Sequence, residues 1–285
     1  MAGVKFNLDK CCACGTGYVN PQPSAESLKS WYACCGHGSK SLTSFAQAMA
    51  SEAEFPNSTV DALRLVTYAK KLLGPFQAGE AKALDIGSGY GFFSKAALEQ
   101  GFQVMAVNPA RAENHIFQQL NGLEPIPLFF EEVDFGSEKF DLVILSQVLE
   151  HLLDPFHVLV KVRNLIKPGG VLAIAVPNVD ALLIKILKSK SSFLGLPGHI
   201  IHFSRQGLSA LLRRAGFEVN LHTYVSRIPY FSISNRLNLQ GKSRNVVNYL
   251  VRVFQRPPLF IADRLGLGLF QNVWALPVRP DRARL

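Results

Sequence analysis

The stretch that decides the fold is ALDIGSGYGFF at residues 83–93. An apolar run that reads as a buried strand is followed at once by glycines at positions 87, 89 and 91. Glycines permit positive φ and let a ligand approach the backbone closely. A dinucleotide fingerprint would be G-x-G-x-x-G, whereas this sequence has G-x-G-x-G after the acid Asp85. The spacing favours a ligand with a small zwitterionic end, bound where the strand ends.

Apolar runs alternate with helical patterns on both sides of this loop. We expect strands at residues 83–86, 103–107, 126–130, 142–146, 171–176, 217–225 and 269–276. The expected helices are 57–73, 91–100, 110–121, 154–166, 181–190 and 204–215. Apolar strands separated by helices of this length predict an α/β fold with a doubly wound, mostly parallel sheet of seven strands.

The composition suits one large domain with attachments. The chain has 285 residues, of which 48% are hydrophobic and 18% are charged, which excludes a disordered or collagenous protein. We expect a Cys-rich N-terminal segment at 1–50, a core at 51–225 and a basic C-terminal extension at 226–285. No uncharged apolar run reaches about 18 residues, and the start lacks the apolar centre of a signal peptide.

All five cysteines lie within the first 35 residues, whereas a disulfide-stapled secreted fold would spread them along the chain. We therefore expect a reducing, cytoplasmic location.

The charge is distributed unevenly. Residues 1–184 carry 14 Lys and Arg against 18 acids, whereas residues 185–285 carry 16 against 3. The basic segment suggests an anionic partner, which could be a substrate, a membrane surface or nucleic acid. Apolar residues accompany the lysines and arginines of 181–268, which is compatible with peripheral contact with an anionic membrane. A cap packed on the core is the alternative.

The sequence resembles the class I S-adenosylmethionine (SAM)-dependent methyltransferases over about residues 57–225. The resemblance rests on the glycine loop, on FDLV at 140–143 followed by QVLEHLLDP at 147–155, and on LIKPGG at 165–170. It implies a Rossmann-like sheet and SAM as the cofactor.

The resemblance also implies roles for single positions. Asp85, Gly87, Ser88, Gly89 and Gly91 would surround the amino-acid part of the cofactor. Asn108, at the end of the second strand, stands where the family more often has an acid that holds the ribose hydroxyls. The further implied contacts are Glu131 near the adenine, and Ser146 and Gln147 under the cofactor.

Three histidines are candidates for a general base that takes a proton from the acceptor: His151, His199 and His202. His151 follows Glu150 directly after the fourth strand. The segment resembles the E-x-x-E-H pattern that binds a divalent metal in quinone-pathway O-methyltransferases, but Gln147 replaces the first acid, so we expect no metal there. His199 and His202 resemble the H-x-x-H-F-S/T stretch of a bacterial branch, where it lies over the acceptor site. A structural role is the alternative for each histidine.

The N-terminal cysteines resemble half of a zinc ribbon. Cys11 and Cys14 form a C-x-x-C pair, but the second pair that completes four ligands in that bacterial branch does not precede them. Cys34 and Cys35 are adjacent, and neighbouring residues rarely both reach one tetrahedral ion. We therefore expect no complete zinc site. A misassigned start, a degenerated site and an intermolecular site stay open as explanations.

The function expected from these features is methyl transfer to a small-molecule, sugar, lipid-linked or quinone-like acceptor. Two alternatives stay open: a methyltransferase-like binding protein without catalysis, and a nucleic-acid methyltransferase. Ser146–Leu149 stands in place of the N-P-P-[YF] tetrapeptide that recognises base amino groups, which disfavours a nucleic-acid partner.

Overall fold

The computed structural model describes residues 6–35, 44–54, 57–188, 191, 194–195, 198–226 and 257–278. Its larger sheet has six strands in the order β4-β3-β5-β6-β9-β8. These are β3 (Lys82–Ile86), β4 (Gln103–Val107), β5 (Phe140–Ser146), β6 (Ile166–Pro177), β8 (Phe217–Val225) and β9 (Phe270–Pro277). The first four are parallel, and β9 pairs antiparallel with both β6 and β8.

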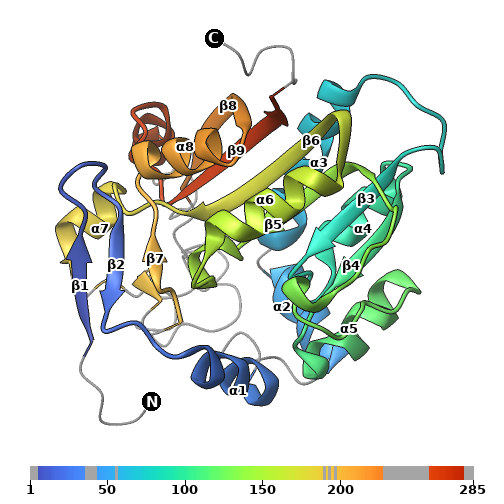
Figure 1. Ribbon diagram of the computed structural model, residues 1–285, viewed down its shortest axis with the longest axis horizontal. Coiled ribbons are helices and arrows are strands. Elements are labelled where there is room, and N and C mark those ends of the chain that lie inside the picture. The colour runs from blue at the N-terminus through green and yellow to red at the C-terminus, as the bar shows by residue number, and fades with distance from the viewer. Residues whose placement is uncertain are drawn as a thin grey trace, which may run out of the picture.

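Helices cover both faces of this sheet (Figure 1). They are α3 (Asn57–Leu73), α4 (Phe92–Glu99), α5 (Arg111–Asn121), α6 (Pro155–Leu165) and α8 (Arg205–Arg214). A further helix, α7 (Leu182–Leu187), packs near Leu269, just before β9. One apolar cluster joins α6 and α8 to the sheet, and another joins α3 and α4 to it. The doubly wound, Rossmann-like α/β fold that the sequence predicts is therefore confirmed.

The expected seventh strand, 126–130, is wrong as a strand. Among the described residues only Ile126 pairs there, through one parallel bridge to Val107. Its N–H donates to the Ala106 carbonyl at 2.8 Å, and its carbonyl accepts from the Asn108 N–H at 3.0 Å. The neighbours at positions 125 and 127 are both proline, whose ring fixes φ at about −65°, and the chain turns into the 3-10 helix η1 (Phe130–Glu132) soon after them. Within the described part of the chain, the sheet therefore has six strands and one bridge.

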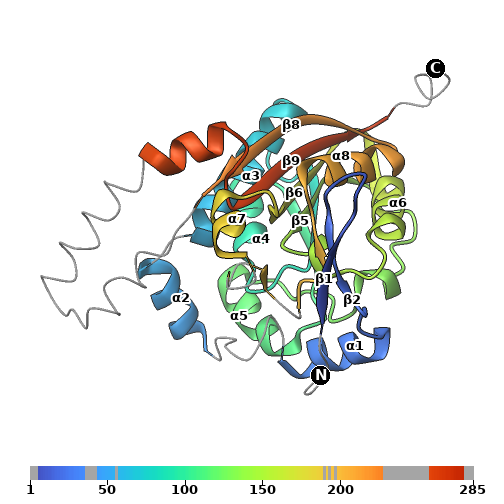
Figure 2. The ribbon, with the colours of Figure 1, turned by 90° about the vertical axis from the view of Figure 1, so that its left-hand side faces the viewer.

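The N-terminal segment packs against the core. The hairpin of β1 (Asn7–Lys10) and β2 (Gly17–Asn20) forms a second sheet with β7 (Ile201–His202). Two helices follow it, α1 (Ala25–Cys35) and α2 (Phe45–Glu54). Figure 2 shows β1 and β2 beside the strands of the core, with α1 beyond the end of the hairpin.

The outcome for the C-terminal part is mixed. Strand 217–225 is confirmed as β8, and 269–276 is shifted by one residue as β9. The helix expected over 181–190 is α7, with residues 189–190 outside the described part of the chain. Residues 227–256, which hold much of the predicted basic extension, also lie outside it. Residues 257–264 form one further helix. No helix in the described residues is long and apolar enough to cross a bilayer.

Candidate active site

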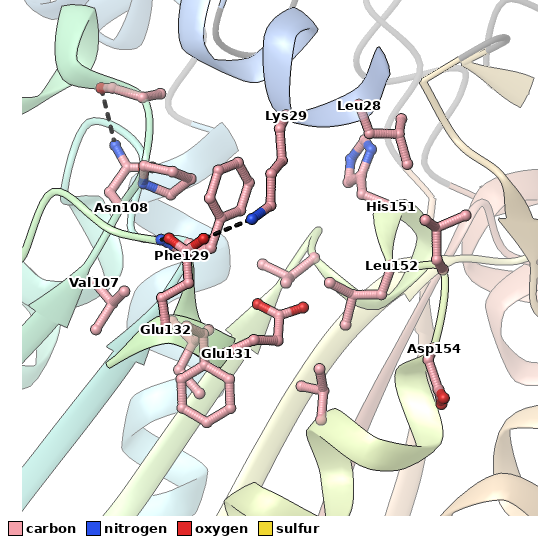
Figure 3. A pocket seen from close by; sticks show the side chains of 18 of the residues that line it. Leu28, Lys29, Val107, Asn108, Phe129, Glu131, Glu132, His151, Leu152 and Asp154 are labelled. Atoms are coloured by element: carbon pink, nitrogen blue, oxygen red, sulfur yellow. Dashed lines mark hydrogen bonds and ion pairs between the residues drawn. The ribbon is translucent and has the colours of Figure 1, made fainter. Parts of the chain in front are cut away.

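A cavity of about 320 Å³ lies at the carboxyl ends of β3, β4 and β5 (Figure 3). Five residues singled out in the sequence line it: Gly87, Asn108, Glu131, Gln147 and His151. The other predicted cofactor residues are not among its lining: Asp85, Ser88, Gly89, Gly91 and Ser146. They lie on β3, on the turn after it, or at the end of β5.

The glycine turn requires glycine for two separate reasons. Gly87 and Gly91 have φ of +67° and +92°, in the left-handed region that side chains disfavour. A Cβ on Gly87 would lie 2.6 Å from Cγ2 of Val148, and both residues line the cavity. A Cβ on Gly91 would lie 2.2 Å from Nδ2 of Asn121, where α4 packs near α5. Gly87 therefore keeps the cavity open, and Gly91 lets the helix after the turn pack.

Asp85 lies buried behind the turn and is held by Ser94. The Ser94 hydroxyl donates to its carboxylate at 2.7 Å. Burial raises the pKa of Asp85 to about 6, because the charged form is poorly solvated, and the Ser94 hydrogen bond opposes this only in part. The carboxyl therefore changes charge just below neutral pH.

This pKa gives a pH-dependent prediction. A cationic ligand beside the turn favours ionised Asp85, so we expect SAM affinity to fall by up to about tenfold per pH unit below pH 6. The same pKa shift affects the free energy of unfolding with the opposite dependence on pH. The ordinary pKa is 3.8, so between pH 4 and 6 the unfolded chain loses a proton that the folded chain keeps. The contribution of Asp85 to the free energy of unfolding therefore falls as pH rises through this window.

Calorimetric titration with SAM and urea unfolding at pH 5, 6 and 7 check both trends. Asp85→Asn, which cannot ionise, should remove the slope in affinity, and the difference in unfolding free energy between wild type and variant should fall as pH rises towards 6 and then level off. A wild-type affinity that is flat from pH 5 to 7 would contradict the placement of Asp85 beside the ligand.

Asn108 is tied to the start of α5. Its side-chain nitrogen donates to Oδ1 of Asn114 at 2.9 Å, and the residue is buried while still lining the cavity. The amide oxygen is therefore the atom left for a ligand hydroxyl.

Helix α1 forms a wall of the cavity that sequence reasoning missed. Leu28 and Lys29 of α1 line it, and Figure 3 shows both beside the predicted residues. The ammonium of Lys29 lies 2.6 Å from Oε1 of Glu132 and 5.5 Å from the centre of the Phe129 ring. No pattern in the first 50 residues indicates this contact, because it joins segments about 100 residues apart.

Gln147 sits in a backbone conformation that is rare for its residue type. Its φ is +56°, and its N–H donates to the Ala175 carbonyl at 2.7 Å. Strained positions of this kind concentrate at functional sites. The turn at Gln147 carries the chain from β5 into the 3-10 helix η2 (Leu149–His151), beside the cavity.

The three predicted histidines lie together. The rings of His151 and His199 meet edge to face with centres 4.8 Å apart, and the His202 ring lies 6.3 Å from that of His199. The Nδ1 of His151 lies 2.9 Å from the Gly198 carbonyl. Since a carbonyl only accepts, Nδ1 carries the proton, and Nε2 of the neutral ring has a lone pair.

Glu150 and His202 are buried beside this group. Burial raises the pKa of Glu150 to about 8 and lowers the pKa of His202 to about 4. Polar ligand atoms of Glu150, His151 and His199 all lie within 4.8 Å of one another. The sequence-based expectation of no metal site did not foresee that His199 joins Glu150 and His151.

The cysteine segment is described only in part. Cys11, Cys12 and Cys14 are free thiols, and the pKa of Cys11 is lowered, chiefly by a hydrogen bond from the Cys14 backbone. The side chains of Cys34 and Cys35 lie outside the described part of the chain. The incomplete zinc ribbon therefore stays a prediction.

Comparison with known proteins decides the family. The family model described as a methyltransferase domain matches residues 60–222, more than half of the chain. The protein belongs to the methyltransferase-domain family. It is a class I methyltransferase with SAM as its cofactor, as the resemblance implied.

Two relatives and one structure illustrate the match. A ubiquinone biosynthesis O-methyltransferase from Xanthomonas axonopodis is 30% identical over 70% of this methyltransferase and 86% of the relative. A tRNA U34 carboxymethyltransferase from Dichelobacter nodosus is 29% identical over 70% of this chain and 66% of that protein. A SAM-dependent methyltransferase structure from Thermotoga maritima, a possible histamine N-methyltransferase, matches with a TM-score of 0.51 at 18% identity. The structural match covers 81% of this chain and 97% of the Thermotoga maritima chain.

Proposed function

We propose that this enzyme methylates a hydroxyl oxygen of a small, quinone-like or lipid-linked acceptor. The observation that carries the proposal is the imidazole of His151 in the lining of the cavity, because a hydroxyl must lose its proton during transfer. The O-methyltransferase relative supports an oxygen acceptor.

Each part of the site has a task in this proposal. SAM, when bound, supplies a methyl group on a sulfonium that an oxygen lone pair attacks in line. The turn at Gly87 and the Asn108 amide oxygen hold the donor, and the α1 wall at Leu28 and Lys29 restricts water. His151 accepts the hydroxyl proton at Nε2. Orientation alone is worth roughly 7–11 kcal/mol in well-placed reactions.

A labelled-methyl assay with three acceptors tests the chemistry. The acceptors are a prenylated catechol, a nucleoside-diphosphate sugar and bulk transfer RNA, each with radiolabelled SAM. We expect label on the catechol oxygen. Label on transfer RNA alone would contradict the proposal and favour the chemistry of the tRNA relative.

We also propose that an apolar face beside the core rests on an anionic membrane. The face comprises α7 and the helix 257–264 with its following turn, which meet where the Leu182 N–H donates to the Leu267 carbonyl (Figure 2). Large apolar side chains stand exposed on both parts: Leu182, Ile186, Leu187, Phe260, Ile261 and Leu265. The most exposed are Ile186 at 66% and Leu265 at 68%.

The charges of this face favour an anionic membrane over a second copy of the protein as its partner. Lys185, Lys188 and Arg264 are exposed, and the single acid in these two segments, Asp263, accepts a hydrogen bond from the Ser226 hydroxyl. Two copies of the face would bring like charges together, whereas an anionic bilayer attracts the cations and takes up the apolar side chains.

Vesicle sedimentation tests this contact. We expect binding to phosphatidylglycerol-containing vesicles and not to phosphatidylcholine alone. Ile186→Glu combined with Leu265→Glu should lower vesicle affinity at least about tenfold, since burial of one such side chain contributes roughly 1.5–3 kcal/mol. Val60→Glu, at an apolar position on α3 that is 42% exposed, is the control. Equal binding by the double variant and the control would contradict the proposal.

A further inference from the structure

We propose that Glu150, His151 and His199 form a binding site for a divalent transition-metal cation, with His199 as the third ligand. Their ligand atoms already lie within 4.8 Å of one another. The third ligand comes from the loop before β7, 48 residues after His151 and not from the sequence pattern around it.

The carboxylate of Glu150 is the first reason. The residue is 1% exposed, and among the described residues neither of its oxygens has a hydrogen-bond partner. An ionised carboxylate buried without a partner is costly, and a bound cation is one of the few groups that satisfies it.

The orientation of His151 is the second reason. Its Nδ1–H is fixed by the Gly198 carbonyl at 2.9 Å, which directs the lone pair to Nε2. Metal-binding histidines commonly donate their other ring N–H to a backbone carbonyl in this way.

The loop that carries His199 is fixed beside Glu150. The Ile200 N–H donates to the Glu150 carbonyl at 2.8 Å, and the His199 N–H donates to the Gly195 carbonyl at 3.0 Å. A Cβ on Gly195 would lie 2.5 Å from Nδ1 of His199. Only glycine at position 195 leaves room for the imidazole of His199 in this position.

The donor set indicates the class of cation. Two imidazoles and one carboxylate suit Mn²⁺, Fe²⁺, Co²⁺ or Zn²⁺ better than Mg²⁺ or Ca²⁺, which prefer oxygen ligands only. A cation on Nε2 of His151 would occupy the lone pair that the proposed function uses as the base. The cation would then acidify an acceptor hydroxyl in its place, and the proton would leave to water. The use of the cation in methyl transfer rests on the proposed function. Binding of the cation to the three side chains does not.

The test is a manganese titration of the full-length, chelator-treated protein, followed by electron paramagnetic resonance. Mn²⁺ is chosen because it prefers oxygen and nitrogen ligands to the thiols of Cys11–Cys14. We expect one Mn²⁺ per chain. His199→Gln and Glu150→Gln should each weaken binding at least about tenfold, as loss of even a supporting contact commonly does. His115→Gln, on the exposed face of α5, is the matched control and should bind as wild type.

Binding of S-adenosylhomocysteine to His199→Gln is measured in parallel to show that the variant is folded. Wild-type Mn²⁺ affinity in His199→Gln, or no stoichiometric binding by wild type at millimolar Mn²⁺, would overturn the inference. Stoichiometric Mn²⁺ binding that His199→Gln loses would support it even if no oxygen acceptor is methylated, in which case only the proposed function fails.

Discussion

Replacing Gly87 by alanine is expected to weaken SAM binding at least about tenfold. The new Cβ would lie 2.6 Å from Cγ2 of Val148, and both residues line the cavity. Overpacking of this kind costs about 1–3 kcal/mol, and each 1.4 kcal/mol is a factor of ten in affinity. Isothermal titration of both proteins with SAM measures the difference.

Gly169→Ala is the matched control for this experiment. Its φ of +82° resembles the +67° of Gly87, but a Cβ there meets nothing within 4 Å. Both variants therefore carry the same backbone strain, and only Gly87→Ala adds atoms to the cavity. Equal SAM affinities in the two variants would show that the space at Gly87 does not belong to the cofactor site.

Replacing His151 by alanine is expected to lower the rate of methyl transfer by about 10²–10⁴-fold, the usual contribution of a group that handles a reacting proton. The side chain faces the cavity and adjoins His199. Single-turnover transfer from labelled SAM to the acceptor found in the assay measures the rate, and a saturating donor separates it from binding.

His115→Ala again serves as the control, because this histidine is exposed on α5. We expect it to react at the wild-type rate. A His151→Ala rate within twofold of wild type would assign His151 a structural role and leave the proton to another group.

The sequence predicts the core of the fold because local signals there agree with one another. The apolar run of β5 and the positive-φ glycines after β3 each specify one structure without help from distant residues. The strand at 126–130 fails because an apolar run alone does not specify a strand. After the one bridge at Ile126 the chain enters a 3-10 helix at Phe130, and the prolines at 125 and 127 fix φ away from the values of an extended strand.

The cofactor side of the site follows from the sequence more readily than the acceptor side. Gly87, Asn108 and Gln147 reach one cavity because the ends of neighbouring parallel strands always lie together. Lys29 arrives from α1, and His199 from the loop before β7, through packing of distant segments that leaves no periodic pattern. The pairing of β2 with β7 likewise joins the N-terminal segment to the core without a sequence signal.

The most direct test of the account is a calorimetric titration of the intact chain with SAM, because every role proposed in methyl transfer depends on a donor held at the turn of residues 87–91. We predict heat that fits one site per chain and disappears when S-adenosylhomocysteine is present in excess. A folded protein, verified by circular dichroism, that gives no heat with either compound would contradict the account.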